Sequence, residues 1–95
     1  MIGVKHDEDK PRWELLPKGI VHQVVQVLTF GAKKYEDDNW KHVEPFNQRY
    51  YGAAMRHIDS WWCGEKIDPE SGCHHLAHAL CCLMFLLWKD DNGSI

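Results

Sequence analysis

The segment GEKIDPESGCHHLAH, residues 64–78, decides the fold of this 95-residue chain, because it leads directly into the apolar run ALCCLMFLLW at 79–88. It holds three carboxylates and three imidazoles within fifteen residues. Asp68 followed by Pro69 is typical of a helix start, since aspartate accepts an unpaired amide hydrogen and proline lacks the donor that would go unmet there. We therefore expect a helix over residues 69–88 with Asp68 as its N-cap.

On such a helix the imidazoles and the leucines fall on different sides. His75 and His78 lie one turn apart, and Cys82 continues their row. A second row consists of Leu76, Leu80, Leu83 and Leu87. This row predicts the side that faces the core, so the histidines should border the core without belonging to it.

Two more helices are predicted upstream, over residues 17–35 and 47–63, with Gly64 placed as a helix stop. No segment alternates with a period of two, so we expect an all-α fold, a small bundle of three main helices. Five tryptophans and 44% apolar residues are many for one short domain. The bundle should therefore be completed by oligomerisation, as a homo-oligomer. We expect a flexible arm (residues 1–10), one helical domain (11–89) and a C-terminal tail (90–95).

Charge and cysteine content exclude several classes of protein. The formal net charge of −3 opposes binding to a nucleic-acid polymer, which needs a basic face. None of the four cysteines forms a Cys-x-x-Cys pair, which indicates reduced thiols in the cytoplasm. No leader opens the sequence, and the apolar run is too short to cross a bilayer, so no membrane partner is expected.

The acidic segment and the histidines predict a metal-dependent catalytic site. Carboxylate oxygens suit magnesium, and imidazoles extend the choice to manganese, zinc or iron. The candidate catalytic residues are Glu65, Asp68 and Glu70, with Glu65 as a possible general base. The candidate metal ligands are His57, Asp68, Glu70, His75 and His78. In the alternative interpretation Asp68 only caps a helix, Glu70 only favours the helix dipole, and the histidines bond to buried backbone.

Basic and aromatic residues form a second candidate group, for a nucleotide. Two arginines seven apart on one helix can hold successive phosphates, and a lysine can add a point charge. Trp40, after Asn39 in a turn, offers a flat face for a base. The candidate nucleotide-binding residues are Lys33, Lys34, Asn39, Trp40, Arg49 and Arg56. The alternatives are a solvated surface for the lysines and a core role for the tryptophan. We expect this group, the acidic segment and the imidazoles to share one polar cavity.

Several blocks, in one order, resemble a known family. They are residues 10–17 (KPRWELLP), 28–35 (LTFGAKKY), 39–40, 49–50, 56–57, 64–72 (GEKIDPESG) and 75–78 (HLAH). Together they resemble the N-terminal domain of the dATP/dGTP diphosphohydrolases, phage-associated relatives of the MazG-type all-α nucleotide pyrophosphohydrolases. The resemblance implies a helical domain that handles purine deoxynucleotides and uses a divalent metal, magnesium or manganese, in the host cell of a phage.

The resemblance leaves two functions open. MazG-type enzymes gather four carboxylates from a Glu-x-x-Glu and a Glu-x-x-Asp pair, and here only Glu65-x-x-Asp68 matches. If the imidazoles replace the missing ligands, the chain is a nucleoside triphosphate diphosphohydrolase that releases pyrophosphate. Otherwise it is a non-catalytic protein that sequesters a host immune signalling nucleotide.

Overall fold

The computed structural model of the chain describes residues 2–93 and is all-α, as predicted. Its elements are η1 (Trp13–Leu15), α1 (Ile20–Lys34), η2 (Asn39–His42), α2 (Phe46–Trp62) and α3 (His75–Asp91), where η denotes a short 3-10 helix. One isolated bridge between Ile67 and His74 is the only β-type pairing within residues 2–93. The helices α1 and α2 begin and end within three residues of the predicted bounds, 17–35 and 47–63.

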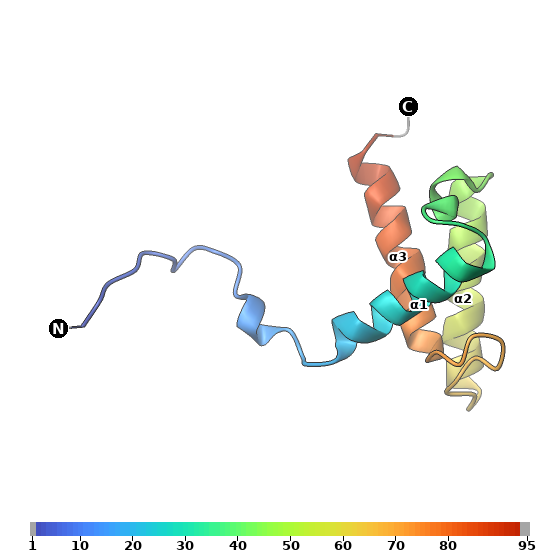
Figure 1. The fold of residues 1–95 in the computed structure, drawn as a ribbon, viewed down its shortest axis with the longest axis horizontal. Helices are drawn as coiled ribbons and strands as arrows, with labels where there is room; N and C mark the ends of the chain where they lie inside the picture. Colours follow the sequence, from blue (N-terminus) through green and yellow to red (C-terminus); the bar gives the residue numbers. More distant parts are fainter. Residues whose placement is uncertain (1, 94–95) are drawn as a thin grey trace.

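Both other long helices pack against α3. Figure 1 shows α1 crossing α3, while α2 lies beside it. The buried core is formed by Val27, Phe46, Ala77, Cys81 and Phe85, and so draws on all three helices. Two of these side chains, Ala77 and Cys81, are small and lie on α3, which lets the neighbouring helices approach its backbone closely.

An aromatic cluster fastens η2 and the start of α2 to α3. The ring of Trp40 stacks on Phe85, with centroids 4.1 Å apart and planes 10° apart, and meets Trp88 edge-on at 4.9 Å. Tyr50 packs edge-on against Phe85 at 5.0 Å, and its hydroxyl donates to the Trp40 carbonyl oxygen over 3.1 Å. Such pairs stabilise a core beyond the area that they bury.

The predicted core side of α3 is wrong. Leu80, Leu83 and Leu87 are 43%, 52% and 63% exposed, while His75, Cys81 and Phe85 on the same helix are buried. Because α3 is apolar on almost every side, its periodicity did not identify the side that meets α1 and α2. The exposed leucines form an apolar surface, and the homo-oligomer that they suggest stays a prediction.

The predicted start of α3 is also wrong, by six residues. The helix begins at His75, and its N-cap is His74, whose Nδ1 accepts a hydrogen bond from the Leu76 amide over 3.0 Å. Asp68 does cap a backbone amide, but that amide belongs to Ser71 within a tight loop. Gly72 then adopts the left-handed conformation, at φ 72°, which ends any continuous helix from Pro69.

Residues before α1 lie outside the three-helix body. Figure 1 shows this segment leading away from the helices, and Trp13 of η1 is 81% exposed. Gly19 precedes α1 with φ 85°, a conformation that glycine adopts without strain. The division into arm, domain and tail stays a prediction, and residues 1 and 94–95 of the arm and tail lie outside the described chain.

The cysteines are free thiols, as predicted. Cys81 and Cys82 are buried, and burial raises their pKa values to about 12 and about 11, which opposes thiolate formation. Cys63 is exposed and Cys73 is half-buried. Among the helices of residues 2–93, none is long and apolar enough to cross a membrane.

Substitution of Phe85 tests the orientation of α3. Phe85→Ala should lower the free energy of unfolding by about 3–5 kcal/mol, because it empties the centre of the aromatic cluster. Leu83→Ala, two residues earlier on the exposed side, should cost less than about 1 kcal/mol. Denaturant unfolding followed by tryptophan fluorescence measures both, and equal losses would contradict the described orientation.

Candidate functional site

The candidate site lies where the end of α2, the loop 64–74 and the first turn of α3 meet. Gly64 ends α2 with φ 106°, and two backbone bonds close the turn: Gly64 N–H to Trp61 O at 3.0 Å and Glu65 N–H to Ser60 O at 2.9 Å. This is the pattern of a Schellman motif, in which glycine supplies the left-handed residue. It directs the chain away from α2 and fixes Glu65 beside the helix end.

The loop then folds back on itself. Asp68 N–H donates to Cys73 O over 2.8 Å, and His75 N–H donates to Lys66 O over 2.9 Å. These bonds hold the two sides of the loop together and place the start of α3 next to the Schellman turn. The predicted grouping of the acidic segment with the imidazoles is therefore found, although a loop rather than a helix start produces it.

Glu65, His75 and His57 form the first hydrogen-bonded chain of the site. Glu65 Oε1 lies 2.6 Å from His75 Nε2, and His75 Nδ1 lies 2.8 Å from His57 Nδ1 of α2. His75 is only 4% exposed, although the Glu65 side chain that bonds to it is 55% exposed. This chain of hydrogen bonds therefore runs from Glu65 at the surface, through the buried His75 ring, to His57 on α2.

Asp68, Ser71 and His78 form the second chain. Asp68 Oδ2 accepts from Ser71 Oγ over 2.8 Å and from Ser71 N–H over 3.2 Å, and Ser71 Oγ lies 2.6 Å from His78 Nε2. Cys73 N–H also donates to Ser71 Oγ, over 3.1 Å. Ser71 thus joins the acidic loop to α3. Sequence reasoning missed it, and the only signal was the Asp-x-x-Ser spacing typical of a side-chain-capped turn.

Stacked imidazoles join the two chains. The rings of His57 and His78 are parallel within 7° with centroids 4.4 Å apart, and the His75 ring lies 5.1 Å from His57. His57, from α2, is thus held by both histidines of α3. We refer to Glu65, Asp68, Ser71, His57, His75 and His78 as the histidine cluster.

Burial lowers the pKa values of two cluster imidazoles, His57 and His78. Burial, followed by the nearby His78 and His75, lowers the pKa of His57 to about 4. Burial also lowers the pKa of His78, although Asp68 opposes that shift. Burial acts to raise the pKa of Asp68, but the two hydrogen bonds from Ser71 outweigh it and hold this pKa below its usual value.

One predicted phosphate-binding lysine lies at the edge of this loop. Lys34 Nζ, at the end of α1, pairs with Glu70, with Nζ 3.1 Å from Oε2 and 3.2 Å from Oε1. The pair joins α1 to the acidic loop. Both side chains are largely exposed, so this ion pair contributes little to stability.

The remaining predicted nucleotide-binding residues are spread over the molecule. Arg49 lies near the start of α2, where its Nη1 donates to Glu44 O over 3.3 Å, and Arg56 is exposed two turns further along. Lys33 is exposed at the end of α1, and Asn39 begins η2. The Trp40 ring lies in the aromatic cluster of the core. Of this set, only Lys34 bonds to the acidic loop.

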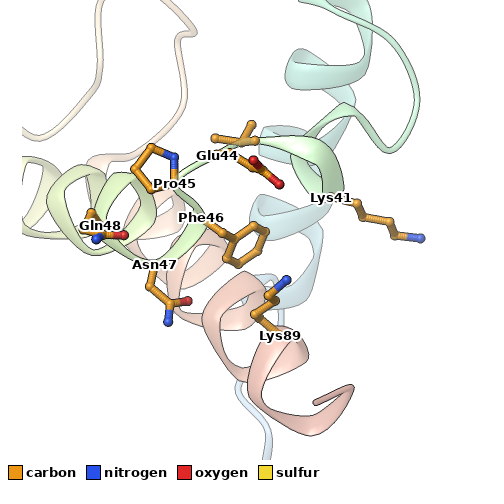
Figure 2. Close-up of a pocket in the computed structure, with 8 residues that line it drawn as sticks. Lys41, Glu44, Pro45, Phe46, Asn47, Gln48 and Lys89 are labelled. Atoms are coloured by element: carbon orange, nitrogen blue, oxygen red, sulfur yellow. The ribbon is translucent and has the colours of Figure 1, made fainter. Parts of the chain in front are cut away.

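Among residues 2–93, the groups predicted to share one cavity lie on different parts of the molecule. A depression of about 270 Å³ lies at the start of α2, away from His57 near its end. Figure 2 shows it between Lys41, the first turn of α2 and Lys89. Arg49 and Arg56 are two turns apart on one helix, so they are separated by roughly 10 Å along its axis and do not converge.

The donor chemistry of the cluster suits a divalent cation, but its arrangement does not. Within residues 2–93 no three His, Cys, Asp or Glu side chains are arranged to hold a metal ion. Glu65 Oε1, both ring nitrogens of His75 and Nδ1 of His57 are engaged with one another, at distances of 2.6–2.8 Å. The structure identifies no metal ligands here, and the predicted use of magnesium or manganese stays a prediction.

Comparison with known proteins establishes the family. The family described as dATP/dGTP diphosphohydrolase, N-terminal, matches residues 2–95. The chain belongs to this family. A dATP/dGTP diphosphohydrolase of Salmonella phage PMBT28 is 34% identical to it over 92 residues, which are 97% of this chain and 31% of the relative. The chain thus spans about a third of the length of that relative. No solved structure matches it significantly.

The lowered pKa of His57 predicts how the free energy of unfolding of this protein depends on pH. The folded protein binds a proton at His57 only near pH 4, whereas the unfolded chain does so near the ordinary value of 6.5. Stability is therefore full above pH 6.5 and falls between pH 6.5 and 4. Because the ring is partly solvated, His57 should account for on the order of 1 kcal/mol of this loss.

Unfolding free energies measured at several pH values test this expectation. His57→Gln removes the titrating ring and should flatten the decline between pH 6.5 and 4. His22→Gln, which removes an exposed imidazole of α1 outside the cluster, serves as the matched control and should leave the decline as in the wild type. A decline that is unchanged in His57→Gln would contradict the assignment.

Proposed function

We propose that this chain binds a purine deoxynucleoside triphosphate and hydrolyses it to the monophosphate and pyrophosphate. Membership of the dATP/dGTP diphosphohydrolase N-terminal family along residues 2–95 supports the substrate class. The phage relative is named for activity on dATP and dGTP, and nearly all of this chain aligns with it. In the proposed reaction, water attacks the α-phosphorus and the bond to the bridging oxygen of the β-phosphate breaks.

The observation that carries the proposal is the histidine cluster itself. Two carboxylates and three imidazoles occupy one side of a 95-residue protein, with Glu65 to His75 at 2.6 Å and His57 to His75 at 2.8 Å. Groups that exchange protons, held in contact with one another at the edge of a core, are typical of catalytic sites. A purely structural role would not require two imidazoles packed against a third, as His75 and His78 are against His57.

Positive charge near the cluster supports binding of the phosphates. Lys34 Nζ is held at the acidic loop by Glu70, and Lys33 and Arg56 are exposed on the neighbouring helices. Lys33 and Lys34 end α1 and Arg56 lies on α2, so we expect a triphosphate to contact cations of two helices. Charge that develops on the leaving pyrophosphate would be stabilised by the same groups.

A second candidate function is a receptor that holds a nucleotide without cleaving it, as a protein sequestering a host immune signalling nucleotide would. One observation favours it. Asp68 Oδ2 already accepts two bonds from Ser71 and lies 3.4 Å from His78 Nε2, so this carboxylate is engaged within the protein. A receptor needs the basic residues but no free carboxylate.

Incubation with nucleotides distinguishes the two functions. Purified protein is mixed with dATP, dGTP and other nucleotides, with and without magnesium or manganese, and the nucleotides are analysed before and after the protein is denatured. Release of dAMP or dGMP with pyrophosphate supports the hydrolase, and its loss without cation supports metal dependence. Intact nucleotide that appears only after denaturation supports the receptor. If no nucleotide is cleaved and none is retained by the protein, both functions are contradicted.

Substitution of Asp68 provides a further test of the hydrolase. Asp68→Asn should lower turnover by about 10²-fold or more, because the charge that orients Ser71 and His78 is lost while the shape of the loop is kept. Asp59→Asn, on an exposed part of α2, is the matched control and should retain turnover. Nucleotide affinity should change little in either variant. Full activity in Asp68→Asn would contradict a catalytic role for the hydrogen bonds that join Asp68, Ser71 and His78.

A further inference from the structure

The hydrogen bonds of the first chain have a direction, and this direction determines where His57 carries its proton. As a carboxylate, Glu65 can only accept, so His75 Nε2 must donate to it across 2.6 Å. A neutral His75 then has its lone pair on Nδ1. That lone pair accepts the proton of His57 Nδ1 across 2.8 Å, which leaves the lone pair of His57 on Nε2.

The direction of these bonds applies to a neutral His75 ring. Its side chain is 5% exposed, and the His57 ring lies 5.1 Å away. A positively charged His75 would instead donate from both ring nitrogens, to Glu65 and to His57. It would also force His57 Nδ1 to become the acceptor and move the proton of His57 to Nε2. The two cases therefore predict opposite tautomers for His57.

His57 Nε2 reaches the surface of the cluster. It makes no hydrogen bond within residues 2–93, yet these residues contain no buried side-chain nitrogen or oxygen that lacks a partner. Nε2 must therefore be accessible to solvent. The ring cannot rotate freely, because it stacks on His78 at 4.4 Å while Nδ1 is bonded to His75.

We propose that His57 Nε2 is the proton acceptor for the attacking water, and that Glu65 and His75 are positioning residues that hold His57 in the tautomer this step requires. The inference rests on the function proposed above. The water oxygen forms a bond to the α-phosphorus, the bond from that phosphorus to the bridging oxygen breaks, and pyrophosphate leaves with the bond electrons. One proton of the water passes to Nε2 and is later released to solvent.

This assignment changes the role expected for Glu65. As general base, Glu65 would have to contact the water through Oε2, because its Oε1 is bonded to the buried His75. In the role proposed here Glu65 does not contact the water. Its action on the water would pass through two imidazoles, as a carboxylate orients a histidine in other hydrolases. The anionic phosphates would also favour the protonated form of His57 once they lie beside it.

The tautomer of His57 is measured directly by nitrogen-15 NMR of the ring nitrogens, without substrate. The wild type should carry the proton on Nδ1, and Glu65→Ala should shift His57 towards the Nε2–H form that free histidine prefers. Glu65→Gln keeps an oxygen that accepts from His75 and should restore the wild-type signal. Asp59→Ala removes an exposed carboxylate elsewhere and should change nothing. A wild-type ring with its proton on Nε2 overturns the inference.

Kinetics distinguish failure of this inference from failure of the proposed function. With dATP or dGTP, His57→Gln should lower kcat by about 10²–10⁴-fold, and Glu65→Ala should lower kcat by roughly 10-fold or more with KM nearly unchanged. If the wild type cleaves nucleotide and His57→Gln cleaves it equally fast, the inference is overturned while the proposed function stands. A wild type that cleaves no nucleotide overturns the catalytic role and the proposed function together, whatever tautomer NMR shows.

Discussion

The backbone closure of the loop 64–74 is the constraint on which the rest of the site depends. The Schellman turn at Gly64 and the pair of bonds between Lys66, Asp68, Cys73 and His75 return the chain to the end of α2 after only a few residues. Without this closure the first turn of α3 would not lie beside His57. His57 of α2 would then lie apart from His75 and His78 of α3, with neither the stacking nor the hydrogen bond that links them.

The histidine cluster and the aromatic cluster have complementary roles along the α2–α3 pair. Near the start of α2, Trp40, Tyr50 and Phe85 hold the two helices by burying large rings. Near the end of α2, His57 and His78 meet through rings of similar shape that also carry polar nitrogens. The first cluster supplies rigidity without chemistry, so the second can keep ionisable groups in contact at a half-buried position.

Family membership and structure together narrow what the cluster can do. The family is named for dATP and dGTP diphosphohydrolases, and the chain matches it along residues 2–95. In this chain Glu65 bonds to His75 directly, and Asp68 is joined to His78 through Ser71. Proton transfer through imidazole is therefore the chemistry best matched to these contacts. Lys34 connects α1 to this loop through its ion pair with Glu70, with Nζ 3.1 Å from Oε2.

The sequence by itself determined the helix content, the bounds of α1 and α2, the stop at Gly64, and the gathering of acids and imidazoles within one segment. These features follow from local rules of spacing, capping and glycine conformation. Only the tertiary structure decided which side of α3 is buried, because a helix that is apolar all round gives no periodic signal. It also decided that Asp68 caps a loop through Ser71, that Trp40 belongs to the core, and that Arg49 lies apart from the cluster. Apart from the local bond between Asp68 and Ser71, these outcomes depend on contacts between residues far apart in the chain, which no local pattern encodes.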